Sequence, residues 1–105
     1  MQFDKDLKSE YKQLFLQVRS LLLEDNNVSE SKKARITTYH YAGSGLCHVR
    51  TMANGVDIGF LKGVLLEDKF GGLKGSGKKI KVFHINKPSY QELTYYINQA
   101  KQLNV

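Results

Sequence analysis

The Asn54-Gly55 pair constrains the fold of this chain more than any other feature of its sequence. Stretches with strand-like alternation lie on both sides of it: LCHVRTMA at residues 46–53 and VDIGFLKG at residues 56–63. Asn and Gly both tolerate a positive φ, and so short a connection joins two strands only when they pair antiparallel. The sequence therefore predicts a β-hairpin over residues 46–63.

Two further stretches are predicted to add strands to this hairpin. KARITTYHY at residues 33–41 is rich in β-branched and aromatic residues, and AGSG at residues 42–45 separates it from the hairpin as a turn. KIKVFHI at residues 79–85 reads as another strand and follows a glycine-rich loop at residues 64–78. Because most of the connections are short, we expect an antiparallel sheet of about four strands.

Amphipathic helices are predicted before and after the strands. In both segments apolar residues recur at three- and four-residue spacing, and a capping-box pattern over residues 89–92 begins the second one. The polar stretch EDNNVSES, residues 24–31, reads as a turn that ends the first helix. The apolar positions are Leu7, Tyr11, Leu14, Phe15, Val18, Leu21 and Leu22, and then Leu93, Tyr96, Ile97, Ala100 and Leu103.

These helices need an apolar surface to cover, and one face of the sheet is the natural one. We therefore predict one α+β domain over residues 1–105, a two-layer sandwich with the N- and C-terminal helices on one face of an antiparallel sheet. Strand alternation predicts which side chains face the helices: Ala34, Ile36, Cys47, Val49, Val56, Ile58, Phe60, Ile80 and Val82. It predicts that the open face carries Arg35, Thr37, Tyr39, Tyr41, His48, Arg50, Asp57, Lys79, Lys81 and Phe83.

Positive charge is concentrated in the middle of the chain. Residues 32–87 carry eleven Lys or Arg and three Asp or Glu, a net charge of +8, whereas the two ends together have a net charge of −2. An anionic partner would account for this distribution, and so would lysines that serve solubility alone. The single cysteine, the charged first ten residues and the lack of a long apolar run predict a cytoplasmic protein without a membrane contact.

The stretch GGLKGSGKK, residues 71–79, has the G-x-x-x-x-G-K spacing of a nucleotide-binding loop. In such a loop a Ser or Thr after the Lys holds magnesium and a helix follows, whereas here Lys79 follows Lys78 and a strand is predicted next. We therefore do not expect nucleotide hydrolysis. Glycine amides and lysines can still hold a phosphate or carboxylate; the alternative is a solvated connection between strands.

Residues 46–85 resemble the YdhG-like domains, a group of small bacterial proteins of unknown function. The resemblance rests on three pieces in this order: Gly59-Phe60-Leu61-Lys62-Gly63, the acidic turn Glu67-Asp68, and Gly72-Leu73-Lys74-Gly75-Ser76-Gly77-Lys78. The chain departs from the family at residues 36–39, where many members carry a Trp and a Pro, and at Lys69-Phe70, where many carry a Pro after the acidic turn. The resemblance implies a frataxin-like fold, with two helices on one face of an antiparallel sheet.

The same resemblance implies an alternative function, because some relatives are regarded as intracellular iron chaperones. Frataxin-type iron binding relies on an acidic ridge at the first helix, and carboxylates suit such cations. The acidic residues available here are Asp4, Asp6, Glu10, Glu24 and Asp25, interrupted by lysines. Strict alternation places Cys47 and His48 on opposite sides of the sheet, so they do not close one metal site. We expect Asp57 to form a salt bridge with Arg50 across the hairpin.

We predict a non-enzymatic domain that recognises an anionic ligand or nucleic acid through the basic Gly/Lys loop, without catalytic residues, metal or cofactor. The predicted contact residues are Arg50, Lys62, Lys74, Gly75, Gly77, Lys78 and Lys79. For the open face three interpretations remain: a nucleic-acid surface, a homodimer interface, or strand residues without a special role.

Overall fold

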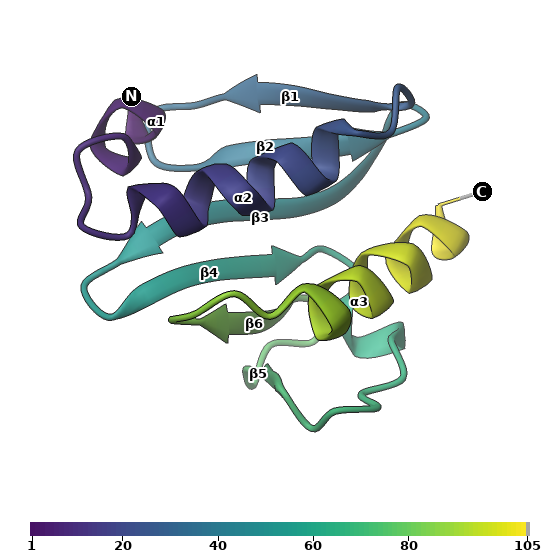
Figure 1. Cartoon of the computed structure of the whole chain (residues 1–105). Helices are drawn as coiled ribbons and strands as arrows, with labels where there is room; N and C mark the ends of the chain where they lie inside the picture. The colour runs from purple at the N-terminus through teal and green to yellow at the C-terminus, as the bar shows by residue number, and fades with distance from the viewer. Residues whose placement is uncertain (105) are drawn as a thin grey trace.

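Residues 1–104 are described by the structure, a computed structural model, as an antiparallel sheet covered by helices (Figure 1). The helices are α1 (Gln2–Asp6), α2 (Lys12–Leu23) and α3 (Tyr90–Leu103), with a short 3-10 turn, η1 (Gly63–Leu65). The strands are β1 (Val28–Lys32), β2 (Thr37–Tyr41), β3 (Ser44–Met52), β4 (Gly55–Phe60), β5 (Leu73–Lys74) and β6 (Lys81–Ile85). Their order across the sheet is β1-β2-β3-β4-β6-β5, and all neighbours pair antiparallel.

The predicted α+β class is confirmed, whereas the predicted number of strands is wrong. The sheet has six strands rather than four. The two additional strands, β1 and β5, are the edges of the sheet, and both lie in stretches that the sequence predicted as turn or loop. Edge strands are often short and carry polar or charged residues that discourage pairing with another chain. Such strands lack the apolar alternation by which a strand is identified.

Both predicted tight turns are present. Met52 pairs with Gly55, so Ala53 and Asn54 form the two-residue loop between β3 and β4. Gly55 itself has φ +157 and lies against the carbonyl oxygen of Ile85, where any side chain would overlap. This close approach requires a glycine at position 55. The two turn residues are Ala53 and Asn54, one position earlier than the Asn54-Gly55 turn that the sequence predicts.

The predicted first helix is two helices, because the chain turns between α1 and α2. Asp6, the last residue of α1, is fully buried, and its Oδ1 accepts hydrogen bonds from the backbone amide of Thr51 at 3.0 Å and its hydroxyl at 2.7 Å. Ser9 Oγ accepts from the backbone amide of Tyr11 at 3.0 Å, a local bond that competes with helix formation. The first turn of the chain is therefore attached to β3 rather than continued into α2.

The predicted faces are correct in β3 and β4 but reversed in β2 and β6. Tyr39 pairs with Cys47 and Phe83 pairs with Ile58, so all four side chains share the face that the helices cover. Ile80, predicted to face the helices, is 40% exposed. A register shift of one residue reverses the two faces of a strand, and the open face consequently lacks the aromatic rings of Tyr39 and Phe83.

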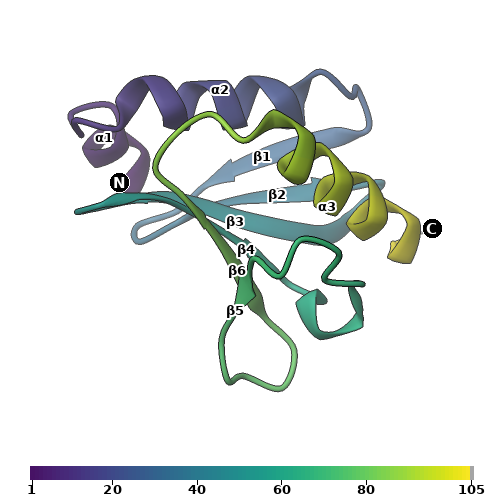
Figure 2. The ribbon, with the colours of Figure 1, turned by 60° about the horizontal axis from the view of Figure 1, so that its bottom comes forward.

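The helices cover one face of the sheet in two parts. Figure 2 shows α2 above β1, β2 and β3, while α3 lies nearer to β4 and β6. Tyr96 of α3 is fully buried, with its ring centroid 6.2 Å from that of Phe60 and 5.0 Å from that of Phe83. Large aromatic contacts of this kind contribute both buried area and favourable ring geometry, and they attach α3 to the sheet.

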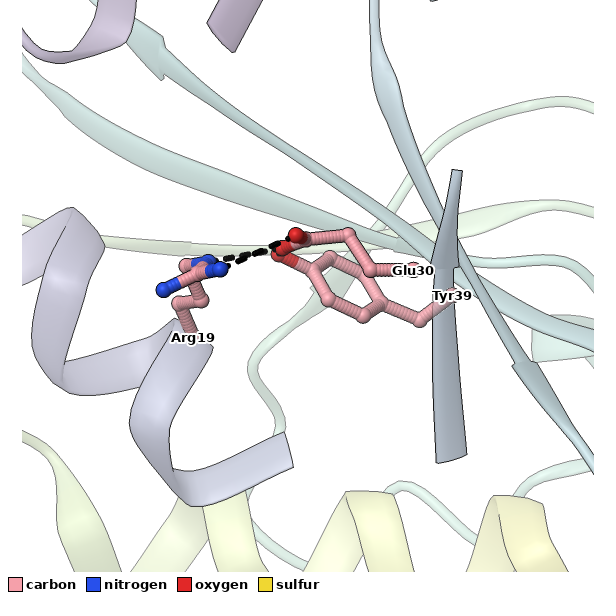
Figure 3. A network of polar contacts seen from close by, with 3 residues as sticks. All are labelled: Arg19, Glu30 and Tyr39. Carbon is pink, nitrogen blue, oxygen red and sulfur yellow. Dashed lines mark hydrogen bonds and ion pairs between the residues drawn. The ribbon is translucent and has the colours of Figure 1, made fainter. Parts of the chain in front are cut away.

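A polar network fixes the edge strand β1 to α2 (Figure 3). The Arg19 guanidinium donates to both carboxylate oxygens of Glu30, at 2.7 and 3.0 Å, and the Tyr39 hydroxyl donates to Glu30 at 2.7 Å. Burial opposes ionisation of Glu30, but the hydrogen bonds from Arg19 and Tyr39 outweigh it and lower the pKa of this carboxyl. The network therefore allows a glutamate to face the covered side of the sheet.

Candidate anion-binding surface

The predicted contact loop forms a hairpin between β5 and β6. Lys74 pairs with Val82, and residues 75–80 connect the two strands. Gly75 has φ +128, a conformation that favours glycine, and its carbonyl oxygen accepts a hydrogen bond from the Lys81 ammonium. The turn from Lys74 to Lys79, called here the lysine hairpin, is thus shaped by its glycine and closed by a lysine.

The lysine hairpin does not have the architecture of a nucleotide-binding loop. Lys78 and Lys79 lead into β6, which is a strand, and β6 runs antiparallel to both of its neighbours. A phosphate-cradling loop instead follows a parallel strand and opens a helix whose N-terminal amides face the ligand. What the lysine hairpin offers is side-chain charge and the amides of its turn.

The base of the lysine hairpin is held by Asp68. Its Oδ1 accepts hydrogen bonds from the Gly72 amide at 3.0 Å and from the Tyr96 hydroxyl at 2.5 Å, and its Oδ2 accepts from the Leu73 amide at 3.3 Å. Partial burial would raise the pKa of Asp68, but the bonds from Tyr96 and the backbone amides keep that pKa below its ordinary value. An ionised Asp68 therefore fixes the point where the hairpin leaves the domain.

The neighbouring Glu67 attaches the same turn to α3. Its backbone amide donates to the side-chain oxygen of Gln99 at 2.5 Å, and the Gln99 amide donates back to the Glu67 carbonyl at 3.3 Å. The Tyr95 hydroxyl also donates to the Glu67 carboxylate at 3.1 Å. The sequence predicted the acidic turn but not its hydrogen bonds to Tyr95 and Gln99 of α3, because no sequence pattern indicates contacts between residues about thirty positions apart.

Three lysines of the hairpin carry free charge. Lys74, Lys78 and Lys79 are exposed, and none of them forms an ion pair or a side-chain hydrogen bond with another of residues 1–104. Lys62 is different, because its ammonium lies 3.4 Å from the Leu103 carbonyl at the C-terminal end of α3. A cation is stabilised at that helix end, so Lys62 is engaged away from the hairpin.

Arg50 also lies apart from the lysine hairpin. It is an exposed residue of β3, opposite Asp57 in register, and β4 separates β3 from β6. The predicted salt bridge between Arg50 and Asp57 is wrong: the Asp57 carboxylate instead contacts Nδ1 of His84 at 2.5 Å. Of the predicted contact residues, the structure therefore brings together Lys74, Gly75, Gly77, Lys78 and Lys79, and not Arg50 or Lys62.

Metal-ligating side chains are dispersed over the described chain. Among residues 1–104 no three His, Cys, Asp or Glu side chains come together as a metal site. Cys47 is fully buried, and burial raises the pKa of its thiol. Asp6 bonds to Thr51, and the Asp25 carboxylate lies 3.0 Å from the Lys101 ammonium, so two of the acidic residues considered for iron are already engaged.

A groove also lies between α2 and α3. It has a volume of about 340 Å³ and is lined largely by apolar side chains, including Leu14, Leu21, Leu93 and the exposed Tyr90. It lies on the helical side of the sheet, and the lysine hairpin projects from the other side (Figure 2). The two features are therefore separate surfaces.

Comparison with known proteins identifies no relative of this chain. No protein-family model, no curated protein and no solved structure matches it. The YdhG-like and frataxin-like resemblance accordingly stays a prediction, and no function is transferred from a relative. Within residues 1–104 there is no helix with the length and apolar character to cross a membrane; the cytoplasmic location stays a prediction.

Proposed function

We propose that this chain is a non-enzymatic binding domain that holds an anionic partner with its lysine hairpin. One observation carries the proposal: Lys74, Lys78 and Lys79 are exposed and unpaired on a turn whose base is fixed by Asp68. Unpaired charges gathered on one turn raise the local concentration of an anion and speed its association. The contact residues are lysines and glycines, which supply positive charge and backbone amides to an anion.

The fixed base of the hairpin supports this function energetically. Binding costs free energy for every segment that must be ordered on association. The hydrogen bonds that the Gly72 and Leu73 amides donate to Asp68 order the start of the hairpin before any partner arrives. Only the lysine side chains and the turn around Gly77 then remain to be immobilised.

The other functions considered from the sequence have less support. A base-stacking nucleic-acid surface or an aromatic dimer interface on the open face would use Tyr39 and Phe83, and both are buried under the helices. The iron-chaperone alternative stays a prediction, and no three-ligand group among residues 1–104 supports it.

Heparin chromatography tests the proposed function. We expect K74Q/K78Q/K79Q to elute at a clearly lower salt concentration than the unaltered chain, because it lacks the three unpaired charges. The matched control is K5Q/K8Q/K12Q, which removes the same charge from exposed positions before and at the start of α2. Equal shifts in the two variants would show that net charge alone causes retention and would refute the proposal, as would no shift in the hairpin variant.

A further inference from the structure

Three exposed aliphatic side chains lie next to the lysine hairpin. Val64 and Leu65 of η1 are 41% and 64% exposed, and Ile80, just before β6, is 40% exposed. We call these three residues the aliphatic patch. Leu65 and Ile80 do not belong to the apolar core of the domain, where burial would stabilise such side chains.

The backbone places the aliphatic patch beside the lysines. The Val64 amide donates to the Lys79 carbonyl at 3.0 Å, which joins η1 to the residue that precedes Ile80. Gly63 lies so close to the backbone of Lys81 that a side chain at position 63 would overlap it. Figure 2 shows η1 and the lysine hairpin projecting on the side of the sheet away from α2. η1 and Ile80 therefore adjoin the Lys79 end of the lysine hairpin, on the side of the sheet that the helices leave open.

This combination discriminates among anionic partners. Single-stranded nucleic acid is held by phosphate contacts together with aromatic stacking, and the aliphatic patch provides no ring for a base. A free phosphate or carboxylate needs charge and donors but gains nothing from aliphatic side chains. The surface of an anionic bilayer offers negative headgroups directly above an apolar layer, which matches lysines and aliphatic side chains on one projection.

Building on the proposed function, we infer that the anionic partner is the surface of a lipid bilayer that contains acidic headgroups. Lys74, Lys78 and Lys79 contact the headgroups, and Val64, Leu65 and Ile80 enter the boundary between headgroups and acyl chains. The expectation of no membrane contact rested on the absence of a spanning segment, and a peripheral contact requires none. The unpaired lysines and the exposed aliphatic side chains lie on a projecting turn, which can approach a flat bilayer surface.

Vesicle sedimentation tests the inference, with heparin retention measured in parallel. The vesicles contain phosphatidylcholine, with or without phosphatidylserine. The variants are K74Q/K78Q/K79Q, V64S/L65S/I80S, the single L65S and the control K5Q/K8Q/K12Q. Circular dichroism melting verifies that each is folded, and L65S changes only the most exposed side chain of the patch.

We expect the unaltered chain to sediment with phosphatidylserine vesicles and not with phosphatidylcholine alone. The hairpin variant should bind vesicles about a hundredfold more weakly and elute from heparin at a lower salt concentration, since each lysine near such a surface contributes roughly fivefold in affinity. V64S/L65S/I80S should lose at least about fivefold in vesicle affinity and keep its heparin retention, with L65S between it and the unaltered chain.

Two results would overturn the inference while the proposed function stands. One is heparin binding without vesicle binding by the unaltered chain, which would indicate a nucleic acid or an acidic protein as the partner. The other is unchanged vesicle affinity in V64S/L65S/I80S and L65S, which would mean that charge alone is recognised. If the unaltered chain binds neither heparin nor vesicles, the proposed function fails together with the inference.

Discussion

At the scale of single residues, Glu30 shows how a charge contributes to stability on the covered face of the sheet. Its carboxylate accepts from Arg19 and Tyr39, and its pKa lies below the ordinary value of 4.5. We expect E30Q to lower the free energy of unfolding by about 1–3 kcal/mol at neutral pH, because hydrogen bonds to a charged group are lost. Urea unfolding measures this difference, with E24Q, at an exposed position, as the control.

The pH dependence of the same comparison follows from the direction of the shift. A group whose pKa is lowered by folding stabilises the folded state above its unfolded pKa, and this contribution is lost as the pH falls through the folded pKa. The stability difference between the unaltered chain and E30Q should therefore be full above about pH 5 and shrink as the pH falls below about 4. A difference that stays constant over this range would show that ionisation of Glu30 does not contribute.

A second residue, Ala42, is held in a strained conformation by the turn between β2 and β3. Its φ of +50 lies in the left-handed region, and Gly43 follows with φ +84. Asparagine tolerates this region better than alanine, and Asn-Gly is the preferred pair for a turn with two positive φ angles. We expect A42N to raise the midpoint of thermal unfolding, with a gain of up to about 1 kcal/mol.

The matched control for this substitution is A53N, in the other two-residue hairpin loop. Ala53 is not among the residues with positive φ in the part of the chain that the structure describes. The same side chain introduced there should leave the midpoint nearly unchanged. Equal effects at both positions would show that the gain does not come from the backbone conformation.

At the scale of elements, the sequence predicted the central strands and the C-terminal helix but not the edges of the sheet. The hairpin of β3 and β4 could be predicted because its apolar alternation and its turn agree. β1 could not, since its inward glutamate is satisfied by Arg19, which lies in α2. The predicted faces of β2 and β6 were reversed, because the side on which Tyr39 and Phe83 lie depends on their pairing with Cys47 and Ile58. Alternation within a single strand does not reveal that pairing.

The candidate site, too, could be predicted only in part from the sequence. The charges of Lys74, Lys78 and Lys79 are visible in the sequence, and so is the acidic turn before them. The bond between Asp68 and Tyr96 is not visible, because it joins residues 28 positions apart. The exposure of Ile80 was missed for the reason that reversed β6: its side chain lies on the side of the sheet opposite to the one predicted.

The attachment of the lysine hairpin gives a prediction for the whole element. D68N removes the negative charge of the carboxylate to which the Gly72 amide, the Leu73 amide and the Tyr96 hydroxyl donate hydrogen bonds. Each hydrogen bond to a charged group contributes about 1.5–3 kcal/mol, so amide exchange at Gly72 and Leu73 should accelerate by at least about tenfold. Hydrogen-exchange NMR measures these amides directly.

E67Q is the comparison for this loop, because the backbone bonds of residue 67 to Gln99 do not depend on its carboxylate. It should leave exchange at Gly72 and Leu73 nearly unchanged, while the amides of β3 and β4 stay protected in both variants. Unchanged exchange in D68N would mean that the hairpin is ordered by its pairing with β6 alone, and the preorganisation argued for the binding function would lose its basis.

At the scale of the whole molecule, the fold separates the covering helices from the charged projection. The helices α2 and α3 bury one face of the sheet, and the lysine hairpin and η1 project on the other side (Figure 2). The net charge of +8 in residues 32–87 is divided between the two sides: Lys74, Lys78 and Lys79 lie on the projection, whereas Lys62 bonds at the end of α3 and Lys69 lies over the Tyr95 ring. The three unpaired lysines favour the approach of the projection to an anionic surface before any contact forms.

Two forces are expected at that surface, and salt distinguishes them. Between about 0.1 M and about 1 M NaCl the Debye length falls from about 10 Å to about 3 Å, so contacts between lysines and headgroups are screened while apolar burial is not. The affinity of the unaltered chain for phosphatidylserine vesicles should fall steeply over this range, and that of K74Q/K78Q/K79Q should fall less. V64S/L65S/I80S should be weaker than the unaltered chain by a similar factor at every salt concentration, because Val64, Leu65 and Ile80 contribute through apolar contact. The difference between the unaltered chain and V64S/L65S/I80S could instead disappear at high salt. Val64, Leu65 and Ile80 would then affect binding only by positioning the lysines, and the binding would be entirely electrostatic.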